Sequence, residues 1–264
     1  MLPRDALLEG CRQPQQLAAL IDLAEQALRT WEPVWSGFVA AELRELALER
    51  LGALTELHLD AGGGWPQAER QRLLLRRREL AAEQPAAEPI APPVGGLLVS
   101  GNFLFDPAEP SEVRAGLVAA GLQPEHLGDI WMRGDRGAQA VIAAEAAEGC
   151  SGVAAQVRSV EVRLEPVPLD QLQWPANRSP RQLSTVEASL RLDAVASAGL
   201  GLSRNRMAEQ IRAGAVRVNW QVVTSPSREL RTGDRVRLEG RGELEVLEIQ
   251  PTKRERWRLQ LRRS

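Results

Sequence analysis

The feature that most constrains the fold of this chain is a pair of short helices followed at once by a β-hairpin, over residues 190–223. Ser203 is placed to begin the second helix, because its hydroxyl can accept hydrogen bonds from backbone N–H groups that the first turn leaves free. Met207 and Ile211 form an apolar i, i+4 pair in that helix, and Gly214 stops it. The first helix, from about Leu190, ends at the glycines of 199–201.

A short antiparallel sheet is predicted after the second helix. Val216 and Val218 alternate with Arg217, and Asn219 tolerates the positive φ of a hairpin turn. Further strands are expected over 235–238 and 244–249, and in a last strand whose apolar residues alternate with arginines over 256–262. The pattern predicts a small helix pair packed over this sheet.

Charge separates this part of the chain from the rest. Residues 1–180 hold 16 Lys and Arg against 25 Asp and Glu, whereas residues 181–264 hold 17 against 10. The whole chain has a net charge of only −2, but its last 84 residues form a basic module. A basic surface is what binding to nucleic acid requires. The alternative interpretation is an arginine-rich face that is simply solvated.

The first 84 residues are predicted to form a mostly helical domain. Apolar residues fall at helical spacing over 14–51 and are interrupted near 31–37, where Pro33 stands. A short strand is expected over 54–59 and a helix over 66–83. That last helix would carry a basic cluster, either in contact with RNA or on a solvated face, made of Arg70, Arg72, Arg76, Arg77 and Arg78. Residues 85–94, rich in Pro and Ala, are expected to form an extended linker.

Residues 95–175 are predicted to form a ferredoxin-like, or RRM-like, domain. Strands are expected over 97–99, 129–132, 138–143 and 157–164, with helices over 111–120 and 144–156. This order is that of a split βαβ fold. Such a sheet can stack RNA bases on exposed aromatics, for which Phe103, Phe105 and Trp131 are candidates, although core positions are the better explanation for all three. The overall fold class is therefore α+β, with a helical N-terminal region, this central domain and the basic module at 181–264.

The basic module resembles the S4 RNA-binding domain. The resemblance rests on an ordered and spaced set: Arg191-Leu192-Asp193, Ser203-Arg204, Ala208, Ile211, Gly214, Val216, Val218-Asn219 and Gly233-Asp234. It implies an RNA-binding surface made of Arg191, Asp193, Ser203, Arg204, Arg206, Arg212, Gly214, Arg217, Val218, Asn219 and Trp220. Two positions depart from the pattern: Asn205 replaces a small hydroxyl residue, and Trp220 replaces the usual glycine. Asp193 repels phosphate and is better explained by pairing with a nearby arginine. Trp220 either stacks on a base or packs on its own sheet.

The resemblance extends over most of the chain. Gly63-Gly64-Trp65, Ala68-Glu69-Arg70, the run from Ser100 to Pro107, Gly128-Asp129-Ile130 and Arg136-Gly137-Ala138-Gln139 resemble YlmH-type S4 proteins. The cyanobacterial and plastid branch of that family is called the photosystem II S4 domain protein. This resemblance implies structured RNA as partner, rRNA with tRNA as a further possibility, on the large ribosomal subunit during rescue of stalled translation.

Two other functions remain open at this stage. S4 domains also occur in pseudouridine synthases and tyrosyl-tRNA synthetases, and Arg191-Leu192-Asp193 superficially matches the catalytic Arg-Leu-Asp of the former. The other alternative is a protein-assembly factor linked to photosystem II, whose acidic part binds a protein. Because the chain shows no P-loop, no zinc spacing and no Ser/His/Asp order, we expect no catalytic residue, metal or cofactor.

The remaining features concern the setting in which the chain works. Its longest apolar runs, such as 95–100, are far short of the ~20 residues of a membrane span. Nothing near the N-terminus resembles a signal peptide, and the two cysteines lie far apart. We therefore expect a cytoplasmic protein without a membrane span and without DNA as a partner.

Overall fold

A computed structural model describes residues 2–11, 13–83, 90–175, 181–238, 241–253 and 255–263. The chain divides into two compact units, residues 1–175 and 176–264. Most of the expected linker, 85–89, lies outside the described residues, and β4 begins at Val94, the last residue of that range. Within the described part, no helix is long and apolar enough to cross a membrane.

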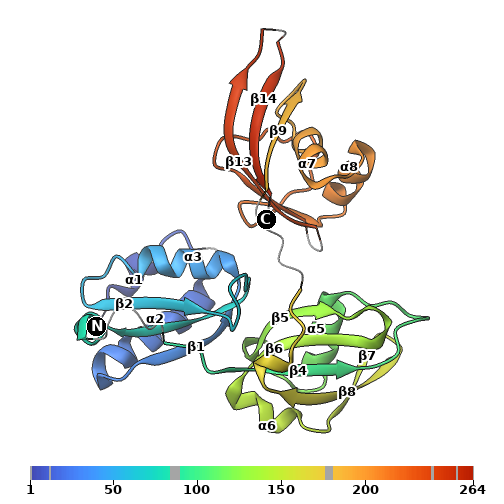
Figure 1. Ribbon diagram of the computed structural model, residues 1–264. Helices are drawn as coiled ribbons and strands as arrows, with labels where there is room; N and C mark the ends of the chain where they lie inside the picture. Colours follow the sequence, from blue (N-terminus) through green and yellow to red (C-terminus); the bar gives the residue numbers. More distant parts are fainter. Residues whose placement is uncertain are drawn as a thin grey trace. The chain divides into compact units, whose positions relative to one another are not determined.

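The N-terminal part of the first unit combines four helices with a three-stranded antiparallel sheet in the order β1-β3-β2 (Figure 1). Its elements are α1 (Arg4–Leu8), α2 (Pro14–Thr30), β1 (Val34–Val39), α3 (Ala41–Arg50), β2 (Leu57–Gly62), β3 (Gln71–Arg77) and α4 (Arg78–Glu83). Helices α2 and α3 bury their apolar faces against the sheet, where Leu17 and Ile21 join Leu73 and Leu75 in one core. The helical N-terminal region is thus confirmed, with a sheet that periodicity did not predict.

The helix expected over 66–83 is wrong for its central part, which is strand β3. Leu73 and Leu75 point into the helix-covered core, while the alternating residues Arg72, Leu74 and Arg76 point to the other face. This alternation of period two is that of a strand. Because β3 is the central strand, both of its faces are buried, and such a strand shows no simple polar and apolar alternation.

Two of the arginines in this segment, Arg72 and Arg76, are buried and do not lie on a solvated face. Arg72 is buried and donates to the carbonyl oxygens of Ser36 (2.7 Å) and Pro93 (2.8 Å) and to the Glu145 carboxylate (2.7 Å). Arg76 is buried as well and pairs with Asp60 at 2.7 Å. Both guanidinium groups are engaged inside the unit, so the prediction of one exposed cluster is wrong for Arg72 and Arg76, whereas Arg78 is exposed.

The central part of the first unit is the expected split βαβ fold. Its elements are β4 (Val94–Ser100), α5 (Pro110–Ala119), η1 (Pro124–His126), β5 (Leu127–Met132), η2 (Gly134–Arg136), β6 (Gly137–Ala143), η3 (Ala144–Ala146), α6 (Ala147–Cys150), β7 (Ala154–Val157), β8 (Val160–Val167) and η4 (Leu169–Gln171). The antiparallel sheet has the order β5-β6-β4-β8-β7, in which the four strands expected from the sequence occupy ferredoxin-like positions (Figure 1).

The second helix of this domain is shorter than the expected 144–156. It ends at Cys150, because Gly152 adopts a positive φ of 71° and the alternating residues 154–157 form the edge strand β7 instead. The face of the sheet that bears Val141 and Ala143 is covered by Phe38 from β1 and by Leu172, which follows η4. The N-terminal and central parts therefore share one core.

The second unit is a six-stranded antiparallel sheet, in the order β11-β10-β12-β13-β14-β9, with two helices packed on it (Figure 1). Its elements are β9 (Arg181–Glu187), α7 (Leu192–Leu200), α8 (Arg204–Arg212), β10 (Val216–Val218), β11 (Gln221–Val222), β12 (Arg235–Leu238), β13 (Gly242–Pro251) and β14 (Trp257–Arg263). Leu192, Met207 and Ile211 from the helices meet Val216 and Val236 of the sheet in one core. The predicted helix pair over an antiparallel sheet is confirmed, and β9 is an addition to it.

Candidate RNA-binding surface

Asp193 ties the N-terminal ends of α7 and α8 together. Its carboxylate accepts from Nε and Nη2 of Arg191, both at 3.1 Å, and from Nε (3.2 Å) and Nη2 (3.3 Å) of Arg204. Only 7% of the Asp193 side chain is exposed, whereas both arginines reach solvent. The expected pairing of Asp193 with an arginine is therefore present, and it holds two guanidinium groups in fixed positions.

The electrostatics of this cluster keep Asp193 ionised. Burial acts to raise the pKa of Asp193, but the hydrogen bonds from Arg191 and Arg204 outweigh it and hold that pKa below its ordinary value. The carboxylate lies in the first turn of α7, where the helix dipole also favours negative charge. One negative charge among two arginines leaves the cluster with net positive charge.

Ser203 caps α8 as predicted. Its hydroxyl oxygen accepts from the backbone N–H of Arg206 at 3.3 Å. The side chains of Arg206 and Arg212 project from α8 into solvent, and the described residues offer neither of them a hydrogen bond or ion pair. At the far end, Gly214 adopts a φ of 75°, which explains the glycine there.

The hairpin between β10 and β11 is also as expected. Asn219 and Trp220 have φ values of 48° and 66°, the two left-handed residues of a type I′ turn. The Asn219 side chain donates to Asp234 (2.7 Å) and accepts from the backbone N–H of Arg235 (2.9 Å), which fastens the turn to the start of β12. The side-chain amide of Asn219 is therefore engaged in hydrogen bonds within the unit. The Val218 side chain is fully buried, so it supports the surface from within and is not itself a contact.

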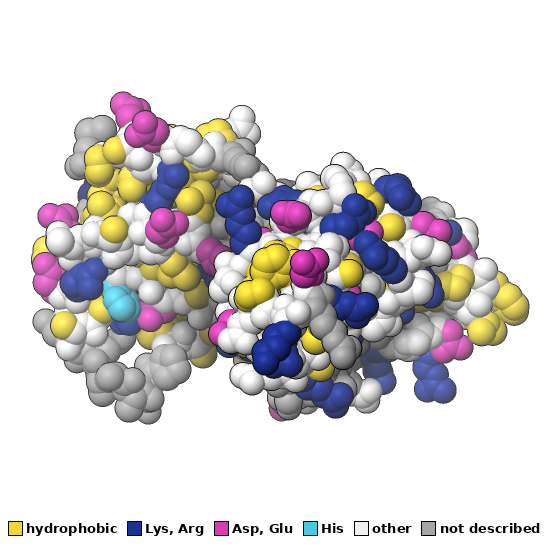
Figure 2. Space-filling view, turned by 90° about the horizontal axis from the view of Figure 1, so that it is seen from above, with side chains coloured by type: hydrophobic (Ala, Val, Ile, Leu, Met, Phe, Trp, Pro, Cys, Tyr) yellow, Lys and Arg dark blue, Asp and Glu magenta, His cyan; other side chains and the backbone are white. Residues whose placement is uncertain are grey.

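The predicted surface residues do not form one patch. Arg191, Ser203, Arg204, Arg206 and Arg212 lie on the two helices. Arg217 stands between Val216 and Val218, both of which point into the helix-covered core, so its side chain is on the opposite face of the sheet. In the view of Figure 2, Lys and Arg side chains are likewise spread among other side chains and do not merge into one field.

Arg237 is a candidate that the sequence pattern missed. It lies directly opposite Arg217 on the neighbouring strand, and its guanidinium carbon is 5.9 Å from the centre of the half-buried Trp220 ring. The pair places two guanidinium groups side by side on the sheet face opposite the helices. The strand period of 235–238, with Val236 and Leu238 buried, is the signal that would have found it.

The three aromatics proposed for RNA stacking do not lie together on one exposed sheet face. Phe103 is buried in the core under α5. Trp131 packs with Trp65 and Trp174 at ring-centre distances of 5.5–6.2 Å, on the sheet face that the N-terminal part covers. Phe105 is exposed, as is Trp174 to a lesser degree. The interpretation as a core residue is therefore correct for Phe103, whereas Trp131 is half-buried at the edge of the core.

The motifs around Trp65 and Asp129 hold the first unit together. Asp129 accepts from Trp65 Nε1 (3.0 Å) and from the backbone N–H groups of Glu69 and Arg70, both at 2.9 Å. Burial raises the pKa of Asp129, against these hydrogen bonds, which lower it. Three donors from the N-terminal part thus converge on one carboxylate of β5.

Comparison with known proteins agrees with this organisation. The family description "YlmH, N-terminal" matches residues 12–80, and "S4 domain" matches residues 190–236. The chain is 27% identical over 221 residues to the ribosome-associated protein quality control protein P2 of Bacillus subtilis (strain 168), which covers 83% of each protein. This chain resembles the YlmH-type S4 proteins over most of its length.

A solved structure, the cell division protein ylmH from Streptococcus pneumoniae, is also similar, with a TM-score of 0.43 and 17% identity over 61% of this chain and 94% of that one. In this YlmH-like chain the matched S4 segment contains the Asp193 cluster, the capped helix α8 and the turn at Asn219. The described residues bring together no group of three or more His, Cys, Asp or Glu side chains suited to a metal ion.

Proposed function

We propose that this chain binds structured RNA through its S4 unit, rRNA or tRNA on the large ribosomal subunit, and serves translation quality control without catalysing a reaction. The observation that carries the proposal is the pair of helix N-termini that Asp193 holds together, with Arg191 and Arg204 fixed and Arg206 and Arg212 free. The relative from Bacillus subtilis is named as ribosome-associated and as a quality control protein, which supports the same assignment.

The physical argument is one of phosphate recognition. The N-terminus of α8 presents first-turn N–H groups and the positive end of its helix dipole, and arginines matched to phosphate geometry stand beside it. The first N–H groups of α7 already donate to the carbonyl oxygens of Arg228 and Pro226, so α7 contributes its dipole and Arg191. Because Asp193 restrains Arg191 and Arg204 before any RNA arrives, less side-chain entropy is lost on binding. Arg217, Arg237 and Trp220 form a second contact region on the other face, so the RNA would meet this unit on more than one side.

The test is RNA affinity as a function of salt. Arg206→Ala and Arg212→Ala should each weaken binding to purified large-subunit rRNA and reduce the slope of log K against log salt by about one unit, because each removes one phosphate contact. Arg163→Ala is the matched control, since Arg163 is an exposed arginine on β8 of the acidic first unit and alternates with the buried Val162 and Leu164. Unchanged affinity and slope in both helix variants would refute the proposed surface.

The alternative of a pseudouridine synthase is disfavoured by the environment of Asp193. The carboxylate of the Arg-Leu-Asp motif is engaged by two arginines and almost fully buried, so it is not available to a substrate. We therefore expect purified protein to convert no uridine in rRNA or tRNA. Stoichiometric formation of pseudouridine would show that the chain is an enzyme.

A further inference from the structure

The loop over residues 102–107 carries the most exposed large hydrophobic side chain of the described residues. Phe105 is 90% exposed and its neighbour Leu104 is 56% exposed. Single exposed apolar residues are common and need no explanation, but two adjacent ones on a loop are unusual. They can serve as a docking site at low entropic cost only if the loop backbone is held in place.

The first half of the loop is anchored in the domain core. Phe103 is buried beneath it, and its backbone N–H donates to the carbonyl of Asp135 at 2.8 Å. The N–H of Gly101 donates to Arg136 (3.3 Å), and the N–H of Leu104 donates to the side chain of Asn102 (3.1 Å). The backbone up to Leu104 is therefore fixed against η2.

The second half is anchored by Asp106. Its carboxylate accepts from the backbone N–H (3.1 Å) and hydroxyl (2.6 Å) of Ser159 and from Nε of Arg158 (2.6 Å). Arg158, in the turn between β7 and β8, also pairs with Glu112 of α5. Leu104 and Phe105 thus stand between two fixed points, so presenting them to a partner costs little conformational entropy.

Charge indicates which kind of partner fits. Residues 94–175 hold 5 arginines and 11 Asp and Glu. An acidic domain repels the phosphates of RNA, so base stacking on Phe105 would work against the local field. A protein surface with an apolar pocket and Lys or Arg at its rim matches both the side chains and the charge. Proteins that bind rRNA carry such basic residues.

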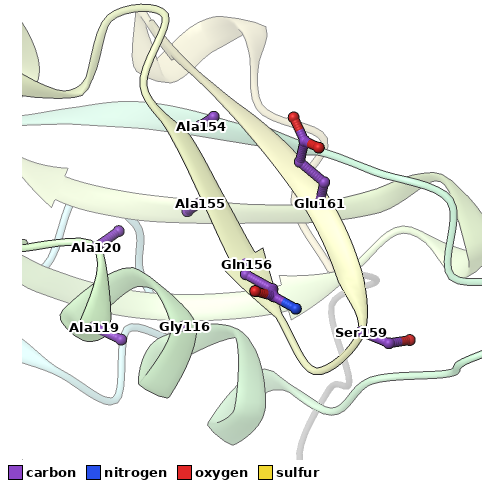
Figure 3. A pocket seen from close by; sticks show the side chains of 8 residues that line it. All are labelled: Gly116, Ala119, Ala120, Ala154, Ala155, Gln156, Ser159 and Glu161. Carbon is purple, nitrogen blue, oxygen red and sulfur yellow. The ribbon is translucent and has the colours of Figure 1, made fainter.

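We infer that Leu104 and Phe105 dock into an apolar, basic-rimmed pocket of a protein of the ribosomal particle. This inference rests on the proposed function for the identity of the particle. A hollow of about 630 Å³ between α5 and β7 lies next to the loop and leaves room for the partner's side chains (Figure 3). Ser159 belongs to both features, because it lines the hollow and holds Asp106. The hollow is lined mainly by small residues, so specificity comes from Leu104 and Phe105.

The experiment compares two probes, purified large ribosomal subunits and the naked rRNA extracted from them. The full-length double variant Leu104→Ser/Phe105→Ser should bind subunits about tenfold more weakly, as expected for loss of an aromatic anchor, and bind naked rRNA as the wild type does. Its melting temperature should be unchanged, since both side chains are exposed. Leu48→Ser, which removes a 38% exposed leucine on α3, is the matched control and should change neither affinity.

Photocrosslinking identifies what the loop touches. A benzoylphenylalanine placed at position 105 should crosslink to a ribosomal protein, at a site surrounded by Lys and Arg. Crosslinks to rRNA or to a second copy of this chain would overturn the inference, as would an equal loss of affinity for both probes or no loss for either.

The two proposals fail in different ways. If the wild type does not bind naked rRNA but binds subunits through Phe105, the RNA-binding proposal fails and the docking inference stands. If the wild type binds both probes and the loop variant does too, only the docking inference fails. A wild type that binds neither probe overturns both.

Discussion

Asp193 is the residue on which the relative positions of the α7 and α8 N-terminal ends depend most directly. It lies in the first turn of α7 and receives hydrogen bonds from Arg191 just before that helix and from Arg204 at the start of α8. The side chain is almost fully buried, so water cannot replace the hydrogen bonds that a substitution of Asp193 would remove. The sequence already predicts that Asp193 pairs with an arginine, because an unpaired carboxylate would repel the phosphates that an RNA-binding surface binds.

Asp193→Asn should lower the stability of the S4 unit by about 2 kcal/mol, since charge-assisted hydrogen bonds to both arginines are lost. The folded-state pKa of Asp193 is depressed, so its stabilisation is fully present above the unfolded value of roughly 3.9 and is lost as pH falls through the folded pKa. Amide hydrogen exchange in α7 and α8, measured from pH 7 down to acid, checks both points. The Asn variant should lose the wild type's dependence on pH below about 4.

The control for this prediction is Glu209→Gln, which removes an exposed charge from α8. It should leave exchange in both helices unchanged. Equal protection in the Asn variant and the wild type would mean that the Asp193 cluster contributes nothing to the fold.

Asp106 also accepts hydrogen bonds from an arginine, in a partly exposed setting. Hydrogen bonds from Ser159 and Arg158 lower its pKa to about 2. Because this pKa is depressed, the order that Asp106 gives to the loop is present above the unfolded value of roughly 3.9 and disappears as pH falls toward 2. NMR titration of the carboxyl carbon should show that midpoint, and Asp106→Asn should speed amide exchange at 104 and 159 at neutral pH. A midpoint near 4 would show that the network is absent in solution.

Helix α8 was predictable because its sequence signals are local. These signals are its N-cap, its apolar pair and its terminal glycine, and the structure has each of them where the residues indicate. Strand β3 had no such local signal. Its arginines are satisfied by Ser36, Pro93, Asp60 and Glu145, partners that lie 16 to 73 residues away in sequence, and only the assembled unit supplies them.

The N-cap of α8 offers a way to separate stability from RNA affinity. Ser203→Ala should cost about 1 kcal/mol because the first turn loses its acceptor. Ser203→Asp keeps an acceptor at the cap and should preserve stability, but it adds a negative charge where phosphate is expected, so RNA affinity should fall in that variant alone at low salt. Thermal unfolding and RNA titration of both proteins give the comparison. If the Asp variant binds RNA as well as the wild type does, this helix end is not at the interface.

The turn at Trp220 carries a conformational cost that the usual glycine would avoid. Its φ of 66° is unfavourable for a bulky residue. Trp220→Gly should therefore stabilise the hairpin by up to about 1 kcal/mol, less what the contact with Arg237 contributes. Trp220→Ala keeps that backbone cost and should leave the fold intact. Both variants should lose RNA affinity if the ring stacks on a base. Affinity equal to that of the wild type would assign Trp220 to packing on its own sheet.

At the scale of the whole chain, charge and fold are divided in the same way. The acidic residues 1–180 include the first unit, and the basic residues 181–264 include the described part of the S4 unit. This division, the order of the central domain and the S4 residues were all predictable from sequence. The predicted surface did not separate Arg217 from the helix arginines, because it was taken from the resemblance as one set; the alternation of Arg217 with Val216 and Val218 is the signal that places it on the other face of the sheet.

This division predicts how the two parts bind when they are produced separately. Residues 181–264 alone should bind naked rRNA at least as tightly as the full chain does, because the net charge of −9 carried by residues 1–180 is absent. The difference should shrink as salt rises from 50 mM toward 150 mM, where the Debye length falls to roughly 8 Å.

Residues 1–175 alone should show no measurable affinity for rRNA. On intact large subunits the order should reverse, with the full chain binding more tightly, since only it can use both the S4 arginines and the Leu104–Phe105 loop. Binding of rRNA by residues 1–175 would instead place an RNA contact in the acidic unit, against its charge.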